Sequence, residues 1–388
     1  MRQILYLGTY ERDYPRNALT IKGLRHAGYD VRELHMPVWE RQPDKTGRFL
    51  RPAALLRFAA RMARAYLTLL ARLPNALRGV DLVVIGYIGQ ADMLVFGPLL
   101  RLLHRPILFN PLVTLTDTLV EDRALLRPGS LAARLVALID RLALALADAV
   151  LVDTPENGAF LIARFGVPAE RLHWLPVGAD EDLFRPLAQH RPPEPGQRLR
   201  VLFYGKMTPL HDAESIVIAA AHLGRCAEFT VIGQGQTGAA VRGIARILEA
   251  DNIRFVDWVP FERLPQEIGQ TDVVLGIFGD GGKAARVVPN KVYQAMAMGA
   301  AIVTRDGPAI RQVLDDGYSA LLVPPDDSIA LAHALRQLSA PVRRAELGAA
   351  AREAFLAIAG LDVQAARLTL VVEALARPAP LAVTEPAK

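Results

Sequence analysis

The sequence predicts an α/β protein of two Rossmann-like, doubly wound domains that face each other across a cleft. The chain has 388 residues, which is too long for a single hydrophobic core. Short apolar runs alternate with helical stretches along most of it, as in parallel sheets built from βαβ units. A proline-rich polar segment at 186–198 separates two halves of similar rhythm, so we interpret it as the linker between the domains.

The first domain is expected over 1–185. It opens with a strand, a helix at 16–27 and a second strand, and helical stretches separate the later strands. An alanine- and leucine-rich stretch at 131–147 is expected to be an ordinary buried helix. The strands predicted in this domain are 2–8, 30–36, 81–87, 106–112 and 148–154.

The second domain is expected over 199–340 and repeats the alternation. Its predicted strands are 200–205, 228–233, 253–259, 272–278, 300–304 and 320–325. Its predicted helices are 211–223, 238–250, 262–269, 290–298, 308–315 and 328–339. We expect helices over 341–376 to cross back to the first domain and 377–388 to form a flexible tail. Ligands of such sheets bind beyond the carboxyl ends of the strands, which places the site in the loops that follow them.

Composition narrows the class of protein further. A hydrophobic content of 52% with 22% charged residues is typical of a folded globular protein. The single cysteine, Cys226, excludes an internal disulfide and a cysteine-rich metal site, and it fits a reducing compartment. The first residues do not have the pattern of a signal peptide, and no stretch is an uninterrupted apolar membrane span. We therefore expect a cytoplasmic protein.

One segment, 48–78, is strongly basic. It contains seven arginines and no acid, interleaved with apolar residues at helical spacing. Such a helix can lie on an anionic membrane surface, but the same pattern also fits a core-facing helix whose arginines are solvated. Both interpretations stay open. Nucleic-acid binding is not supported, because the segment has few aromatic residues on which bases could stack.

A glycine motif suggests one candidate site. Gly233, Gly235 and Gly238 form G-x-G-x-x-G between a strand and a helix, and Asp257 ends the next strand, where an NAD ribose ligand would lie. The motif lies in the second βα unit of its domain, however, whereas the dinucleotide fingerprint belongs to the first. Glycine-rich turns also occur in nucleotide-sugar binders, so Gly233 and Gly235 are candidate donor-binding residues as well. An NAD-dependent oxidoreductase therefore remains an alternative.

The distribution of lysine suggests a different site. The chain has only six lysines, and Lys206, Lys283 and Lys291 all fall in loops at the predicted carboxyl edge of the second sheet. A compact ammonium suits a phosphate group, and a helix that begins near Asn290 would add backbone N–H donors. Like charges at the positive end of a helix dipole are otherwise unfavourable, which favours an anion site over ordinary surface charge.

In order and spacing, several segments resemble the donor domain of the family 4 glycosyltransferases of the GT-B fold. They are FYGKMTPLHDAESIVIAA, FTVIGQGQTG, ALLVPPDD and the long run from IRFVDWV to AAIVT. The segment ADAVLVDTPENGAFLIARFGVPAERLHWLPVGADEDLF resembles the end of the acceptor domain in that family. The resemblance covers nearly the whole chain, most strongly 147–330. It implies a retaining transfer of a sugar from a nucleotide diphosphate sugar, without an essential metal.

The resemblance also assigns donor-binding residues. The family's Gly-Arg after the first donor-domain strand matches Gly205 and Lys206, and its following lysine falls on His211, which we expect to be partly charged at neutral pH. The family's two glutamates fall on Arg286 and Gln294. Gln294 can still bind ribose hydroxyls through its amide, whereas Arg286 can clamp a phosphate bidentately. Compared with the family pattern, the site thus has one more cation for the phosphates and lacks the carboxylates expected near the sugar.

Departure of a nucleoside diphosphate leaves negative charge that fixed cations stabilise. Lys206, Arg286 and Lys283 are the candidates for this role, with Lys291 second. In the front-face mechanism that the resemblance implies, the departing phosphate takes the acceptor's proton. Asp117, with Asp122 behind it, is the candidate for a separate base, and a helix-capping role is equally open for either.

On the acceptor side, the loop GTYERDYPRN resembles the one that faces donor and acceptor across the cleft. Its candidate residues are Gly8, Tyr10, Arg16 and Asn17, although Arg16 also fits an ordinary surface residue of a first helical turn. The D-x-D sequence at 180–182 fits a helix start better than a metal site.

Together these observations predict a metal-independent enzyme that transfers a hexose-like sugar from a UDP- or GDP-linked donor. The acceptor is expected to be a saccharide or lipid-linked, in surface polysaccharide or glycolipid synthesis. Peripheral membrane association through 48–78 would fit a lipid-linked acceptor. A catalytically degenerate nucleotide-binding scaffold is an alternative, because Arg286 and Gln294 replace the usual glutamates.

Overall fold

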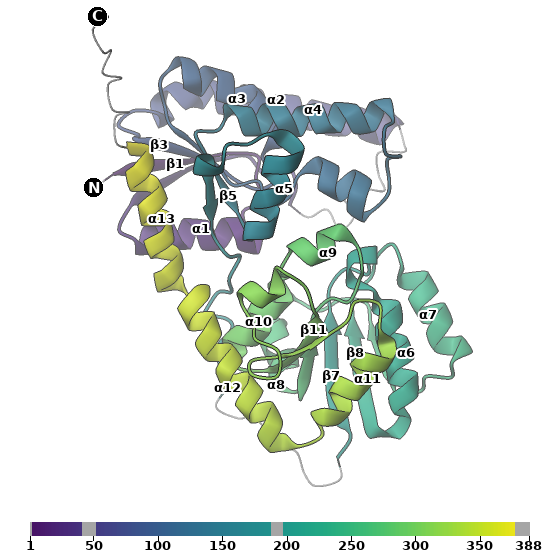
Figure 1. Cartoon of the computed structure of the whole chain (residues 1–388). Coiled ribbons are helices and arrows are strands. Elements are labelled where there is room, and N and C mark those ends of the chain that lie inside the picture. The colour runs from purple at the N-terminus through teal and green to yellow at the C-terminus, as the bar shows by residue number, and fades with distance from the viewer. Residues whose placement is uncertain (1, 41–51, 188–196, 377–388) are drawn as a thin grey trace, which may run out of the picture.

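The computed structural model describes residues 2–40, 52–187 and 197–376 of the chain. Two six-stranded parallel sheets with helices on both faces form two bodies, one above the other in Figure 1. This confirms the predicted α/β architecture of two doubly wound domains. Most of the predicted linker and the whole of the predicted tail lie outside the described residues.

The first sheet has the strand order β2-β1-β3-β4-β5-β6, and every pairing is parallel. The strand β6 was not predicted, because three residues with the sequence LHW carry too short an apolar pattern. The strands are β1 Gln3–Gly8, β2 Asp30–His35, β3 Leu82–Ile85, β4 Ile107–Phe109, β5 Ala149–Val152 and β6 Leu172–Trp174.

Helices cover both faces of this sheet. On one face, α1 (Pro15–His26) packs in the same apolar cluster as the C-terminal helix α13 (Leu361–Ala376). A second apolar cluster holds the other face to four helices. These are α2 Pro52–Ala76, α3 Gln90–Leu102, α4 Leu131–Leu146 and α5 Pro155–Phe165. A single π-helical turn, η2 (Asp117–Asp122), lies between β4 and α4.

The second sheet has the order β12-β11-β10-β7-β8-β9 and is also parallel throughout. Its strands are β7 Leu199–Tyr204, β8 Ala227–Ile232, β9 Ile253–Val256, β10 Val273–Leu275, β11 Ala301–Arg305 and β12 Leu321–Val323. The helices between them are α6 Ala213–Leu223, α7 Gly238–Ile247, α8 Leu264–Gly269, α9 Gly282–Arg286, α10 Asn290–Met298 and α11 Ser328–Gln337.

Two local predictions in this domain are wrong. The helix expected at 308–315 is only a 3₁₀ turn, Ile310–Gln312, because glycines at 307 and 317 bracket a segment with room for little more than one turn. The glycine-flanked stretch that was expected to be an open loop before α10 forms the short helix α9.

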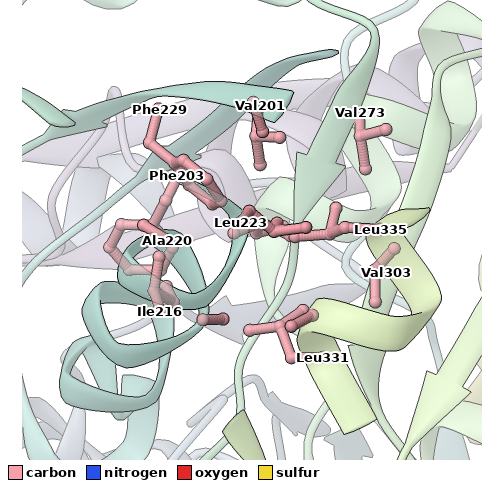
Figure 2. Packing of buried hydrophobic residues seen from close by; sticks show 14 of the residues in the cluster. Val201, Phe203, Ile216, Ala220, Leu223, Phe229, Val273, Val303, Leu331 and Leu335 are labelled. Carbon is pink, nitrogen blue, oxygen red and sulfur yellow. The ribbon is translucent and has the colours of Figure 1, made fainter. Parts of the chain in front are cut away.

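The core of the second domain forms where β7, β10 and β11 meet α6 and α11. Figure 2 shows Val201 and Phe203 of β7 lying over Ile216 of α6 and Leu331 of α11, all of them buried. Parallel strands covered on both faces are expected to be continuously apolar, as β7 is. This packing fixes the sheet whose carboxyl edge carries the predicted site.

The C-terminal helices join the two domains. Helix α12 (Pro341–Ile358) packs against α10 and β11 of the second domain, whereas α13 packs against α1 of the first (Figure 1). Among the described residues, the stretch Pro341–Ala376 is long and apolar enough to cross a membrane by length and composition alone. It is broken between its two helices, however, and Phe355 and Leu368 are each buried in a domain core.

Two neighbouring leucines of α13 test whether this helix is part of the first domain's core. Leu368 is buried against Gly23 of α1, while Leu370 is 72% exposed. We expect Leu368→Ala to lower the free energy of unfolding by about 2–5 kcal/mol and Leu370→Ala to change it by less than about 0.5 kcal/mol. Denaturant unfolding of both variants measures this, and equal effects would contradict the packing described here.

Candidate active site

Five of the predicted donor-binding residues gather at the carboxyl edge of the second sheet. Gly205 directly follows β7 with φ +144°, and a Cβ atom there would lie 3.1 Å from Nζ of Lys291. The same Cβ would be 3.6 Å from the His211 ring. Gly233, which ends β8, donates its backbone N–H within this edge, and Gly235 packs on the loop after β7. The strand ends thus bring Lys291 and His211 to one point beside a glycine.

Lys291 is a buried cation. Its side chain is on the second residue of α10, the residue is 5% exposed, and Nζ lies 3.7 Å from the ring centroid of Phe203. Nζ donates to the Gly276 carbonyl at 3.3 Å, and no carboxylate of the described residues forms an ion pair with it. Burial lowers the pKa of Lys291 well below its usual value of 10.5. A negatively charged ligand at this point would favour the ammonium form and raise that pKa again.

His211 lies beside this lysine. Its Nδ1 is 3.2 Å from the Thr208 hydroxyl, and its ring stands edge-on to Phe203. Burial, with the charges of Lys291 and Lys283 adding to it, lowers the pKa of His211 well below 6.5. The ring is therefore neutral at pH 7, which corrects the expectation of a partly charged side chain. A neutral imidazole can still donate one N–H to a phosphate oxygen.

Gln294 is held by the sheet. It is 4% exposed, and its amide oxygen accepts a hydrogen bond of 2.8 Å from the Tyr204 hydroxyl. A ligand hydroxyl at this position would therefore have to be recognised through the amide nitrogen. The role of Tyr204 as the partner of Gln294 could not be predicted from the sequence, because Tyr204 fits the apolar pattern of β7.

The glycine motif has a structural explanation. A Cβ on Gly233 would lie 2.0 Å from the Gly205 carbonyl oxygen, and a Cβ on Gly235 would lie 2.3 Å from that of Met207. The glycines thus permit the loops after β7 and β8 to pack together. Asp257 forms an ion pair of 2.6 Å with Arg242. The dinucleotide interpretation is not favoured, because both of its features have partners within the protein.

The two cations of α9 pair with acids of the first domain. Arg286 Nη2 lies 2.6 Å from Asp117 and 3.0 Å from Glu121, both in η2. Lys283 Nζ lies 3.1 Å from Asp117 and 3.6 Å from Asp122. We call these five side chains the ion-pair cluster. In this conformation the predicted phosphate cations and the predicted base therefore neutralise one another across the cleft.

Further contacts hold Arg286 in the cleft. Its guanidinium lies 4.1 Å from the ring centroid of Phe160, and its backbone carbonyl accepts from the Thr154 hydroxyl at 2.5 Å. Its Nε is buried without a hydrogen-bond partner within the described part of the chain. Glu121 was missed from the sequence, although its i,i+4 spacing from Asp117 was a signal that both acids face one side.

The remaining predicted donor-side residues lie near by. Lys206 is exposed in the loop after β7. Asn290 is the first residue of α10, and its side chain hydrogen-bonds to that of Tyr14 in the first domain. The start of α10 thus lies next to the first domain.

The predicted acceptor-side loop is largely buried. Tyr10 and Asn17 are fully buried; the Tyr10 hydroxyl donates to Glu33, and the Asn17 amide oxygen accepts from Tyr6. A Cβ on Gly8 would collide with the Asp92 carboxylate at 2.2 Å. These contacts fix the shape of the loop, and its role on the acceptor side stays a prediction.

Arg16 belongs to the same buried group. It is 1% exposed, so the alternative of an ordinary surface residue is wrong. Nε donates to Asn110 at 2.6 Å, and Nη1 donates to the carbonyls of Leu175 and Pro176. Arg16 therefore anchors the segment that leads from the first domain toward the second.

The acids at 180–182 serve the domain connection. Asp180 and Asp182 pair with Lys22 of α1, and Glu181 accepts from the backbone N–H of Leu361 at the start of α13. They lie in a turn and not at a helix start. Over the described ranges, no group of three or more His, Cys, Asp or Glu side chains is placed to hold a metal ion.

Comparison with known proteins identifies the family. A model described as "Glycosyl transferases group 1" matches residues 198–340, and one described as "Glycosyl transferase 4-like domain" matches 10–178. The chain belongs to the group 1 glycosyltransferases of the GT-B fold. Each model covers one of the two sheets, so the family assignment extends over both domains.

Curated relatives match in part of their length. The amylovoran biosynthesis glycosyltransferase AmsK of Erwinia amylovora is 27% identical over 188 residues, which is 46% of this chain and 44% of the relative. A D-inositol 3-phosphate glycosyltransferase of Xylanimonas cellulosilytica is 28% identical over 261 residues, 60% of this chain and 58% of the relative. The chain thus matches about half the length of these relatives.

Solved structures show the same fold over nearly the whole chain. Sucrose-phosphate synthase from Thermosynechococcus elongatus aligns with a TM-score of 0.71 and 18% identity, covering 97% of this chain and 99% of that one. HepE from Anabaena in complex with UDP-glucose aligns with a TM-score of 0.67 and 14% identity, covering 96% and 100%.

The buried Lys291 predicts proton uptake when a nucleoside diphosphate binds. The free protein holds the pKa values of Lys291 and His211 low, and an adjacent diphosphate raises both, so binding near neutral pH draws protons from the buffer. Titration calorimetry in buffers of different ionisation enthalpy measures the uptake. We expect Lys291→Met to reduce it and to weaken binding by about 10–100-fold, as for loss of a charged hydrogen bond. Identical heats in all buffers would contradict this.

The ion-pair cluster predicts that weakening it strengthens diphosphate binding. Glu121→Gln, alone and with Asp117→Asn, removes negative charge that competes with a ligand for Arg286 and Lys283. We expect the affinity for UDP or GDP to rise by up to about tenfold in the double variant, which corresponds to about 1.4 kcal/mol. Glu346→Gln, at an exposed ion pair elsewhere, is the control. Weaker binding in both cluster variants would show that the acids support the site.

Proposed function

We propose that this protein is a retaining glycosyltransferase that moves a hexose-like sugar from a UDP- or GDP-linked donor to a saccharide or lipid-linked acceptor. The observation that carries the proposal is Lys291, a buried lysine without a carboxylate partner among the described residues, next to Gly205 at the carboxyl edge of the second sheet. Burial disfavours the charged form of this side chain unless an anion lies beside it, and a diphosphate at the start of α10 would supply that anion.

Several residues would act on the leaving group. As the bond from the sugar to the diphosphate breaks, negative charge grows on the phosphate oxygens, and Lys206 and Lys291 would stabilise it. Arg286 and Lys283 can join them once the ion-pair cluster releases them. The departing phosphate takes the acceptor's proton, so no separate base is required, and these cations would take the role that a metal ion has at a leaving diphosphate. Asp117 could serve as a base only after it leaves Arg286, which makes it the weaker candidate.

The comparisons support the substrate class. HepE, which shares the fold, was solved with UDP and with UDP-glucose, and this favours a UDP-linked donor. AmsK is named for amylovoran biosynthesis, which fits a role in surface polysaccharide or glycolipid synthesis. A cytoplasmic location, at the inner face of the membrane, follows from such a role because the donor would be a cytoplasmic metabolite.

A catalytically degenerate nucleotide-binding scaffold is the second candidate. It is favoured by one observation: Arg286, which stands at a family glutamate position, is fully engaged with acids of the facing domain. An assay for donor hydrolysis separates the two candidates, since an active enzyme releases the nucleoside diphosphate slowly even without acceptor.

Calorimetric titration with UDP, GDP and NADH tests the binding site itself. We expect one nucleoside diphosphate to bind and Lys206→Ala to weaken its binding by about 10–100-fold, because a charged phosphate contact is lost. Asp257→Ala is the matched control and should leave binding unchanged. Binding of NADH alone, lost with Asp257→Ala, would overturn the proposal.

A further inference from the structure

The outer helices of the first domain expose an unusual amount of leucine. Of the 22 large hydrophobic residues that are exposed in the described ranges, eleven lie on or directly beside α2, α3 and α4. We call this surface the leucine layer. Its exposed leucines are Leu55, Leu56, Leu67, Leu70, Leu102, Leu103, Leu125, Leu131, Leu135, Leu138 and Leu142.

Helix α4 carries the most regular part of the leucine layer. Leu131, Leu135, Leu138 and Leu142 follow the i, i+4, i+7, i+11 spacing of one helix face, and they are 83%, 57%, 48% and 46% exposed. The sequence-based prediction of an ordinary buried helix at 131–147 is therefore wrong. The helix has two apolar faces, one against the core and one toward solvent. Packing in the core explains only the first of them.

Helix α2 has the same double character. Leu69 and Leu73 are buried against the sheet, whereas Leu56 and Leu67 are 73% and 69% exposed on the opposite side. The core-facing interpretation of the basic segment thus holds for one face of the helix, while the membrane-surface interpretation of the other face stays a prediction. Residues 48–51 of that segment lie outside the described residues.

The charges of the leucine layer have a single sign. Over 52–80, 90–116 and 123–147 the only acids are Asp92 and Asp140, which are 0% and 1% exposed. The exposed charged side chains of the layer are arginines, at positions 57, 61, 64, 72, 78, 101, 127, 134 and 141. On α4, Arg134 and Arg141 lie along one edge of the leucine stripe.

We propose that the leucine layer as a whole, with α4 at its centre, docks this protein on the surface of an anionic lipid bilayer. Exposed leucines would enter the boundary between headgroups and acyl chains, and the arginines beside them would meet lipid phosphates. This deepens the proposed function, in which the acceptor is lipid-linked, by naming the surface and the partner. A partner protein or a second copy would need acids to match so many arginines, and the described surface of this chain offers no such acidic face in the layer itself.

The layer is placed suitably for an acceptor that reaches the cleft from a membrane. Helices α2, α3 and α4 form one side of the first domain in Figure 1. The chain runs from η2, which contacts α9 across the cleft, through the exposed Leu125 to Leu131 at the start of α4. The leucine layer therefore begins next to the mouth of the candidate site.

Vesicle sedimentation tests the docking surface with the full-length protein. The probes are vesicles of phosphatidylcholine alone and of phosphatidylcholine mixed with phosphatidylglycerol, at low and high salt. We expect binding to the anionic vesicles that weakens with salt. The quadruple variant L131Q/L135Q/L138Q/L142Q should bind at least about tenfold more weakly, since apolar insertion is lost. R134Q/R141Q is a second variant that leaves the leucines in place, and at low salt it should bind about 30-fold more weakly, since each of the two charges contributes about 1 kcal/mol near the surface.

The variant I247Q/L356Q/L370Q removes exposed apolar side chains from outside the leucine layer and is the matched control. Retained binding by this control, together with loss by both layer variants, would support the proposal. No vesicle binding by the wild type, equal loss in the control, or dimerisation through the layer in place of lipid binding would overturn it. Titration with UDP and GDP in the absence of lipid distinguishes this failure from failure of the proposed activity.

Discussion

The two domains meet across the cleft through a compact set of ion pairs. Arg286 and Lys283 reach from α9 of the second domain to three acids on η2 of the first. The pairs are short and poorly exposed, so they are screened less than surface ion pairs are. Because the proposed function gives the same cations a role at the departing diphosphate, domain contact and ligand binding would compete for them.

The buried Lys291 lies at the same proposed site but is not part of this competition, because it forms no ion pair with a carboxylate of the described residues. Within the ion-pair cluster, the cations of one domain are paired with the acids of the other. Lys291 and the neutral His211 stay behind it, at the glycine turn after β7, with pKa values that burial holds low. A bound diphosphate would pair with Lys291 and would also attract Lys283 and Arg286 of α9. In the proposed site, Lys291 would thus be free to meet an anion, while Lys283 and Arg286 are paired with protein carboxylates.

Much of the fold could be predicted because it depends on local patterns. Alternating apolar strands and amphipathic helices specify parallel sheets, and the carboxyl edge of the second sheet follows from the order of its elements. The rarity of lysine then led to Lys291, whose burial confirms that it is no ordinary surface charge.

What could not be predicted depends on partners that are distant in the chain. Arg286 and Asp117 are separated by 169 positions, and no local signal shows that they pair. The burial of Arg16 depends in the same way on Asn110 and on the carbonyl of Leu175. The exposed stripe of α4 was missed for another reason, since an alanine- and leucine-rich helix has the same composition whether one face or two are apolar.

A crystal structure of the protein bound to UDP, with GDP tested in parallel, examines the central claim most directly. The account predicts that phosphate oxygens lie within hydrogen-bonding distance of Lys291 Nζ and of the backbone after β7, and that Arg286 has moved from Asp117 toward the ligand. A nucleotide bound along Gly233–Gly238 with its ribose at Asp257, or a bound diphosphate that leaves Lys291 untouched and the Arg286–Asp117 pair intact, would contradict it.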